Sequence, residues 1–359
     1  MKNTILFIYN WVENKADQFI ECATKTTVDC IKNALNLSGF EVIPLNLYNI
    51  AQLRDSIKQI NPTLAFVIAE GFLDNPETLF DGSGSTLIRE ILAEMNVPYT
   101  HSTPSGMINC RNKDITYKIL RETNVPVPDS FVLPNATLFK NYINDIEETI
   151  AYPMFVKPTG GGNSIGIDNS SIVYNRHELQ AKVNGLTALI GDSSIIIETF
   201  LSGREYTVGV MGNFTTTVLP VIAFPKDYQV RSYKIKKTES KDKNNIEVFF
   251  YNDPLYQKVC PIALNTFSAL KVNDVIRIDI KEDSLGNPMV IDVNGSPSLA
   301  PGGSLAFMAQ NMDISHGELI NMLLWESMQR FKINPTPELL RVKEGINLRI
   351  KHYSENFVA

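Results

Sequence analysis

The stretch FVKPTGGGNSIGI, residues 155–167, places a lysine on an apolar strand and follows it with a proline and three consecutive glycines. Glycines weaken a strand, and a run of three forms a loop whose backbone N–H groups can approach a ligand closely. A lysine directly before such a loop indicates a phosphate-binding element. The alternative is a flexible hairpin with an ordinary surface lysine, and this stretch alone fits both.

The composition is typical of a soluble protein with roughly two or three domains. The chain has 359 residues, of which 44% are hydrophobic and 20% charged. The longest apolar runs, such as LAFVIA (64–69), are far too short to span a bilayer. The start of the chain is interpreted as a strand and not as a signal peptide, because no small-residue cleavage site follows it. The net charge of −6 argues against nucleic acid as the main partner.

The four cysteines and four histidines lie scattered along the chain. There is no CxxC pair, so we interpret the cysteines as free thiols of a reducing compartment and expect a cytoplasmic protein. The same dispersal argues against a metal site built from histidine and cysteine.

The first part of the chain alternates strand and helix signals. Strands are predicted at 5–10, 40–47 and 64–71, and helices at 18–39, 51–60 and 86–96. This alternation predicts a parallel sheet flanked by helices. Ligands of such sheets bind at the carboxyl ends of the strands, so residues 10–13, which end in Glu13, and the pair Glu70–Gly71 are expected to face a site.

The pattern changes after residue 130. Strand-like segments then follow in an antiparallel-looking succession, and they are SFVLP, YPMFVKP, SIIIETFL, EYTVGVMG and TVLPVIAFP. Further helices are predicted at 113–124, 176–190, 257–271 and 314–331. Residues 332–359 form a polar tail without an interpretable motif.

Acidic and amide side chains lie on two strands joined by the turn DSLGN. Asp279 belongs to IRIDI (276–280), and Asp292 and Asn294 belong to VIDVNGSP (290–297). Alternation puts Asp292 and Asn294 on one face, and Asp279 can lie across from them. Two carboxylates and an amide oxygen are ligands that Mg²⁺ takes while bridging nucleotide phosphates. The alternative is an acidic pair neutralised by a nearby arginine or lysine.

Two neighbouring features fit the same interpretation. Arg277 shares the strand face of Asp279, where a cation could hold a developing oxyanion. In IIIETFLSGREYTVGV (195–210), backbone groups of residues 198–201 can face a purine edge, and Glu205 can reach ribose hydroxyls. Taken singly, Arg277 and Glu205 fit the role of ordinary surface residues equally well.

In this order along the chain, the elements resemble the ATP-grasp superfamily and, within it, the D-alanine–D-alanine ligases. Residues 155–167 look like the family's VKP-x-GSS-(V/I)-G loop, and IETFLSGREYTV (197–208) is similar to its E-hinge-L-x-G-x-E-(F/Y)-T-V element. RIDI (277–280) and IDVNGSPSLAPGGSL (291–305) look like its R-x-D and (L/E)-x-N-x-x-P-G pair. VPYTHSTPSGMINCRNKDITYKILRETNVPVP (97–128) follows its PYTGS to PVP segment. Neither a P-loop GxxxxGK[ST] nor a GxGxxG after the first strand is present.

The resemblance implies an α/β chain (α+β overall) with the ATP-grasp fold. A Rossmann-like N-terminal domain would span 1–101, and two α+β subdomains enclosing ATP would span 102–194 and 195–331, followed by the tail 332–359. The first subdomain would carry the glycine-rich loop and the second the magnesium site. A homodimer is also implied.

The resemblance further implies the residues of the site. ATP would be bound by Lys113, Lys157, Gly161, Gly162, Ser164, Glu198, Thr199, Phe200, Leu201 and Glu205, and by Lys234 or Lys236 in the basic loop 230–243. Asp279, Asp292 and Asn294 would hold two Mg²⁺ ions. Arg277 would steady a tetrahedral intermediate, and Ser304 would bind the carboxylate of a second amino acid.

The implied activity is that of an ATP-dependent carboxylate–amine ligase joining two amino acids through an acylphosphate. A kinase that stops after phosphorylating its substrate and a non-catalytic nucleotide-binding module are the alternatives.

The departures from the family gather where the first substrate would bind. IYNWVENKADQF (8–19) replaces the GGxSxE signature, which leaves Glu13 as the nearest candidate to hold an amino group. Glu70–Gly71 replaces an HG pair, and Arg89 stands where a glutamine falls. We therefore expect an altered specificity, in which Glu70 and Arg89 select a charged or zwitterionic substrate. Elsewhere, Asn163 replaces a serine, Asp292 a glutamate and Ser298 a glycine.

Overall fold

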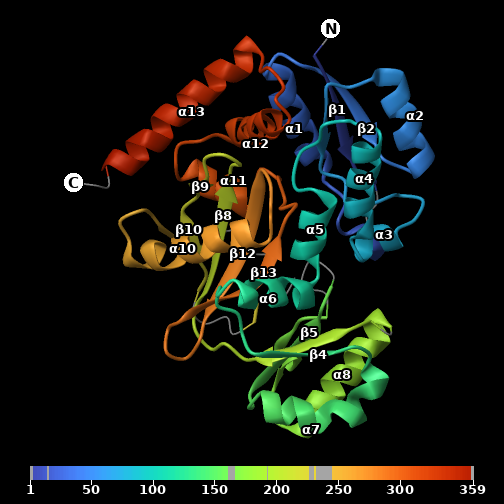
Figure 1. Cartoon of the computed structure of the whole chain (residues 1–359), viewed down its shortest axis with the longest axis vertical. Coiled ribbons are helices and arrows are strands. Elements are labelled where there is room, and N and C mark those ends of the chain that lie inside the picture. The colour runs from blue at the N-terminus through green and yellow to red at the C-terminus, as the bar shows by residue number, and fades with distance from the viewer. Residues whose placement is uncertain are drawn as a thin grey trace.

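The computed structural model describes residues 3–13, 16–160, 166–191, 193–225, 230–231 and 245–356. Its elements form three sheets and the helices packed on them (Figure 1). Within the described ranges, we find no helix with the length and hydropathy that a membrane span requires.

The N-terminal part is the predicted parallel sheet, with strand order β2-β1-β3. Its elements are β1 (Thr4–Tyr9), α1 (Lys25–Leu37), β2 (Glu41–Asn46), α2 (Ile50–Ile60), β3 (Leu64–Val67), α3 (Glu77–Phe80) and α4 (Ser83–Glu94). The central strand β1 is almost wholly buried, because helices cover both faces of a parallel sheet. The predicted helix at 18–39 begins only at Lys25, where the Thr24 side chain accepts from the Thr27 N–H and caps it.

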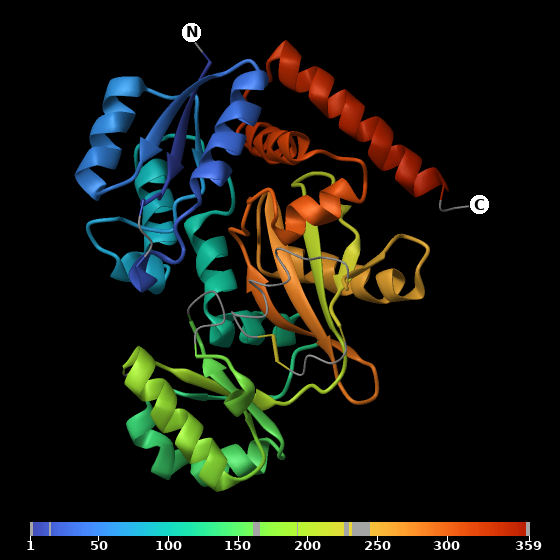
Figure 2. The same cartoon turned by 180° about the vertical axis from the view of Figure 1, so that it is seen from behind.

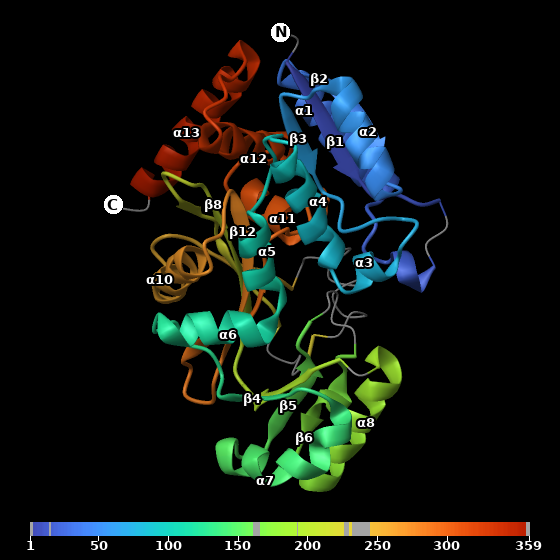
Figure 3. The same cartoon turned by 45° about the vertical axis from the view of Figure 1, so that its right-hand side comes forward.

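A four-stranded antiparallel sheet, β4-β7-β5-β6, forms the central part. Its strands are β4 (Ser130–Leu133), β5 (Met154–Pro158), β6 (Ile172–Val173) and β7 (Ile195–Thr199), and its helices are α7 (Phe139–Thr149) and α8 (Arg176–Ile190). Figure 3 shows both helices on the side of the sheet that faces away from the rest of the molecule. The sequence analysis missed α7, although Phe139, Ile143 and Ile146 recur at helical spacing and are buried against the sheet.

The C-terminal part is an antiparallel sheet with strand order β11-β10-β8-β12-β13, and β9 pairs with β8. Its strands are β8 (Glu205–Met211), β9 (Thr217–Val218), β10 (Val221–Ala223), β11 (Glu247–Phe249), β12 (Val275–Glu282) and β13 (Pro288–Asn294). The helices of this part and of the preceding connection are α5 (Pro104–Arg111), α6 (Lys113–Glu122), α10 (Pro254–Ala269), α11 (Ser304–Gln310) and α12 (His316–Arg330). The predicted hairpin at the DSLGN turn is confirmed as β12 and β13.

The tail contains a long helix that the sequence analysis did not identify. Helix α13 (Pro337–Asn356) runs beside α12 (Figure 2). Leu339 and Ile346 are fully buried in a core shared with α1 and α12, and Val342 and Ile350 pack against that core. These residues recur at helical spacing, but the polar residues between them conceal the pattern.

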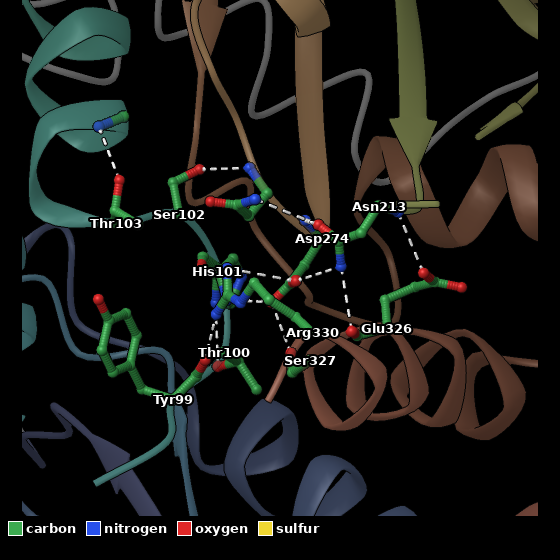
Figure 4. A network of polar contacts seen from close by, with 12 residues as sticks. Tyr99, Thr100, His101, Ser102, Thr103, Asn213, Asp274, Glu326, Ser327 and Arg330 are labelled. Atoms are coloured by element: carbon green, nitrogen blue, oxygen red, sulfur yellow. Dashed lines mark hydrogen bonds and ion pairs between the residues drawn. The ribbon is translucent and has the colours of Figure 1, made fainter. Parts of the chain in front are cut away.

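A buried polar network ties the N-terminal sheet to the C-terminal sheet and to α12 (Figure 4). The backbone N–H of His101 donates to Asp274 Oδ2 at 2.8 Å, and Arg330 Nη1 donates to the His101 carbonyl at 2.7 Å. Ser327 and Asn213 also donate to the Asp274 carboxylate. The network therefore fixes the connection that leads from the N-terminal sheet to α5.

Replacing His101 with asparagine should flatten the pH dependence of stability on the acid side of neutrality. Burial lowers the pKa of His101 well below its usual 6.5, and the charges of Arg89 and Arg330 lower it further. The imidazole stays neutral in the folded protein, whereas the unfolded chain takes up the proton. The contribution of His101 to stability is therefore present above the unfolded pKa and is lost as the pH falls below it.

Asparagine suits this position because it does not titrate and tolerates the φ of +68° found at residue 101. Melting temperatures measured from about pH 7.5 to about pH 5 should fall more steeply for the wild type than for His101→Asn. Two parallel curves would contradict this account.

Candidate active site

A cavity of about 600 Å³ is lined by all three parts of the chain. The N-terminal part contributes Ile68 and Glu70, and the central sheet contributes Lys157. The C-terminal sheet contributes Asp279 and Asp292. The structure thus brings the strand lysine and the acidic hairpin to one cavity, although they lie far apart in the sequence.

The acidic side chains face one another because of the register of β12 and β13. Asp279 lies opposite Asp292, and Arg277 lies opposite Asn294. The register shifts directly after Asp279, and such an irregularity re-aims side chains at the edge of a site. The Asp279 carboxylate accepts from Thr207 Oγ1 at 2.8 Å and from Arg277 Nη2 at 3.2 Å.

The carboxylates of the hairpin are paired with cations. Lys113 Nζ lies 3.0 Å from Asp292 Oδ1, and Arg277 lies beside Asp279. Burial raises the pKa of Asp292, but the charges of Lys113 and Lys157 outweigh burial and lower it overall. The Asp292 side chain still keeps 37% of its surface exposed, because it faces the cavity. Both carboxylates therefore have a cationic partner in this structure, and this pairing does not decide between the two interpretations of the acidic pair.

The strand lysine is also paired. Lys157 Nζ lies 2.7 Å from Glu198 Oε1, and the two side chains are only 5% and 4% exposed. Lys157 is on β5 and Glu198 on β7, the strand hydrogen-bonded to it. A second pair in the lining joins Arg231 and Glu205, whose Nη1 and Oε1 lie 2.6 Å apart.

The family follows from a comparison with known proteins. A family model described as "D-ala D-ala ligase C-terminus" matches residues 119–325, more than half of the chain. The chain belongs to the D-alanine–D-alanine ligase family. It is therefore an ATP-grasp enzyme of the class that forms carbon–nitrogen bonds, an ATP-dependent carboxylate–amine ligase.

Named relatives cover most of this ligase. It is 25% identical over 295 residues to D-alanine–D-alanine ligase A of Bacillus cereus, covering 82% of this chain and 90% of the relative. It is 27% identical over 305 residues to a D-alanine–D-alanine ligase of Clostridium botulinum, covering 83% of this chain and 91% of the relative.

Solved structures of two ligases share the fold. The D-alanine–D-alanine ligase of Bacillus anthracis superposes with a TM-score of 0.69 at 22% identity, covering 91% of this chain and 98% of that one. The VanG D-Ala:D-Ser ligase of Enterococcus faecalis superposes with a TM-score of 0.68 at 15% identity, covering 91% and 100%. Identities this low show a common fold and nothing about substrates.

Most of the predicted site residues that lie in the described part of the chain line the cavity. The lining includes Lys113, Lys157, Glu198, Phe200, Leu201, Glu205, Arg277, Asp279, Asp292, Asn294 and Glu70. Thr199 ends β7 and Ser304 begins α11, and neither belongs to the lining. Five predicted residues lie outside the described part of the chain, and they are Gly161, Gly162, Ser164, Lys234 and Lys236.

The structure does not bring Glu13 or Arg89 to the cavity. Glu13 is exposed in the connection that follows β1, and the lining glutamate of this region is Glu21. Arg89 is fully buried on α4, where its Nη1 donates to the carbonyl and to the hydroxyl of Ser85. Burial lowers its pKa to about 10. The expectation that Arg89 contacts a substrate directly is thereby corrected.

Four charged lining residues were not foreseen: Glu21, Arg111, Arg231 and Lys281. Glu21 was hidden because the sequence analysis placed it inside a helix. Lys281 had a usable signal, since it continues the alternation of Arg277 and Asp279 along β12. Arg231 lies in the basic cluster 230–243, but its carboxylate partner could not be read from the sequence.

Lys157→Met should destabilise the fold, because it leaves the Glu198 carboxylate buried without its cation. Removing one partner of a buried ion pair costs about 3 kcal/mol or more. The double variant Lys157→Met/Glu198→Gln should recover much of this loss, since no uncompensated charge remains. Chemical denaturation would measure both.

The matched control is Lys25→Met, which breaks the exposed pair between Lys25 and Asp29. Exposed pairs contribute about 0–1 kcal/mol, so this variant should stay close to wild type. Equal losses for the two lysine variants would contradict the buried pair as a source of stability.

Proposed function

We propose that this ligase joins two amino acids by an amide bond and activates the first carboxylate with ATP as an acylphosphate. The observation that carries the proposal is the shared cavity. Its lining combines Lys113, Lys157 and Glu205, which we assign to the nucleotide, with Glu21 and Glu70 of the N-terminal part. The relatives named D-alanine–D-alanine ligase support the choice of two amino acids.

In the proposed reaction, the carboxylate of the first amino acid attacks the γ-phosphate of ATP and ADP leaves. The amine of the second amino acid then attacks the acyl carbon, phosphate departs and the nitrogen loses a proton. Lys113 and Lys157 neutralise phosphate charge, and Arg277 holds the oxyanion that forms at the acyl carbon. The walls of the cavity limit the access of water, which would hydrolyse the acylphosphate.

We further propose that Asp279, Asp292 and Asn294 hold Mg²⁺. Their carboxylate and amide oxygens are the hard donors that this ion prefers, and the register of the hairpin groups them. Asn294 Oδ1 accepts one hydrogen bond, from the Ser296 N–H at 2.9 Å, which leaves a lone pair for a ligand. When bound, the ion supplies positive charge to the phosphates. In this structure the positive charge beside Asp292 is the Lys113 ammonium.

Asp292→Asn should separate turnover from nucleotide binding. The change removes a charged oxygen ligand, so ADP release in the presence of Mg²⁺ should fall by about a hundredfold or more. It also frees the Lys113 ammonium from its partner, so the affinity for ATP measured in EDTA should stay constant or rise. Calorimetry with and without Mg²⁺ would measure both effects.

The control for this change is Asp313→Asn. Asp313 is an exposed residue with a φ of +55°, which asparagine tolerates, and it is not among the lining residues. It should leave turnover and binding unchanged. A loss of ATP affinity in Asp292→Asn that is equal in EDTA and in Mg²⁺ would contradict the assignment of Asp292 to the metal.

We propose that the first-substrate end selects a charged or zwitterionic amino acid, with Glu70 as the selecting group. Asn10 holds the backbone of Glu70 through a hydrogen bond of 2.9 Å from the Glu70 N–H. In the part of the chain that the structure describes, the Glu70 carboxylate lines the cavity and has no ion pair, and the buried Arg89 interacts with it through its charge. A carboxylate in this setting favours a substrate that carries an ammonium or guanidinium group.

A matrix of amino-acid pairs with ATP and Mg²⁺, scored by phosphate release and product mass, tests the ligase. We expect an amide product only when an amine is present. Phosphate release or a phosphorylated product without an amine requirement would favour the kinase, and binding without turnover would favour the non-catalytic module.

The same matrix tests Glu70. Glu70→Gln should lower kcat/KM for first substrates with a cationic side chain by about tenfold and leave neutral ones nearly unchanged. Glu90→Gln, an exposed glutamate on α4, is the matched control. An unchanged substrate order in Glu70→Gln would overturn the proposed role.

A further inference from the structure

Tyr117 lies directly behind the nucleotide end of the cavity. It belongs to α6, is 1% exposed and is not itself among the lining residues. Its hydroxyl oxygen lies 2.9 Å from Glu198 Oε2, 3.3 Å from Lys157 Nζ and 3.0 Å from the Ile291 carbonyl oxygen. The hydroxyl therefore contacts both members of the buried ion pair and the strand that carries Asp292.

The Tyr117 hydroxyl donates its hydrogen bond to Glu198. A phenol has one proton to donate, and the carboxylate is both the nearer and the charged acceptor. Burial raises the pKa of Tyr117 well above its usual value, and the charge of Glu198 raises it further, so the phenol stays protonated. Tyr117 thus supplies Glu198 Oε2 with a donor, while Lys157 supplies Oε1.

The Lys157 ammonium uses all three of its donors within the protein. They point to Glu198 Oε1 at 2.7 Å, to the Ile291 carbonyl at 3.0 Å and to the Tyr117 hydroxyl at 3.3 Å. The contact with Tyr117 is the longest and has a neutral acceptor, so it is the one given up most readily. A phosphate oxygen that replaces it leaves the other two bonds of Lys157 in place.

We propose that Tyr117 is a positioning residue for the nucleotide. It orients the Glu198 carboxylate and acts as the acceptor that a phosphate oxygen replaces at Lys157. Without the hydroxyl, Glu198 Oε2 has no donor and attracts the Lys157 ammonium. The ammonium then points away from the ligand. The inference rests on the proposed role of Lys157 in binding phosphate.

Tyr117→Phe tests the proposal, because it removes only the hydroxyl and keeps the ring that Lys157 faces at 5.7 Å. We expect the Kd for ADP, measured by calorimetry, to rise about tenfold, the typical effect of losing a hydrogen bond to a charged group. The KM for ATP should rise by the same factor, with kcat and the KM values of the amino acids nearly unchanged. A role confined to folding would not produce this split.

The matched control is Tyr256→Phe. Tyr256 is also a buried residue, its hydroxyl donates to the Val218 carbonyl at 3.0 Å, and it is not among the lining residues. It should lower the melting temperature without changing the Kd for ADP. Equal changes in Kd for the two variants, or none for Tyr117→Phe, would overturn the proposal.

A double-mutant cycle gives a second readout. In a Glu198→Gln background no carboxylate needs orienting, so Tyr117→Phe should change the Kd for ADP by less than it does in the wild type. An undiminished effect would also overturn the proposal. Because calorimetry needs no turnover, these results stand even if the amino-acid matrix yields no amide product.

Discussion

The ion pair between Lys157 and Glu198 is the interaction on which the rest of the site depends. Both charges are almost completely removed from water, and such a pair is tolerated only when hydrogen bonds satisfy its remaining atoms. The Ile291 carbonyl and the Tyr117 hydroxyl meet that requirement. These two groups come from outside the central sheet, so the pair also connects that sheet to α6 and to β13.

The same constraint applies to the other charged residues of the cavity, which neutralise one another in pairs of opposite sign. Lys113 faces Asp292, Arg277 faces Asp279 and Arg231 faces Glu205. Burying this many charges near one another is feasible only because their signs alternate. In the function proposed above, an anionic nucleotide would replace one partner of such a pair.

The remainder of the fold holds the walls of the cavity in place. The Asp274 network fixes the connection between the N-terminal sheet and α5, and α13 closes the core formed by α1 and α12. Glu70 is tied to this framework through Asn10, whose side chain also donates to the carbonyls of Leu47 and Gly71. The backbone at Glu70, which we propose as the first-substrate end, is therefore supported by hydrogen bonds, although its sequence departs from the family pattern.

Local patterns were enough to predict the alternating strands and helices of the N-terminal part, the β12–β13 hairpin and the polar residues on it. Periodicity and turn residues act over short distances, so they can be read from neighbouring letters. The ordered set of motifs was also enough to indicate the family. The apolar residues of α7 and α13 recur at helical spacing, but the polar residues between them concealed this pattern.

Pairing between distant segments was decided only by the tertiary structure. Nothing local to Lys157 indicates Tyr117 or Ile291, and nothing local to Glu205 indicates Arg231. Arg89 is buried although it was expected in the cavity, and Glu21 lines the cavity although it was expected in a helix. Burial depends on how α4 and the segment before α1 pack, and their own residues do not reveal that packing. Contacts of this kind arise when the chain folds back on itself, and a sequence pattern with a reach of a few residues does not contain them.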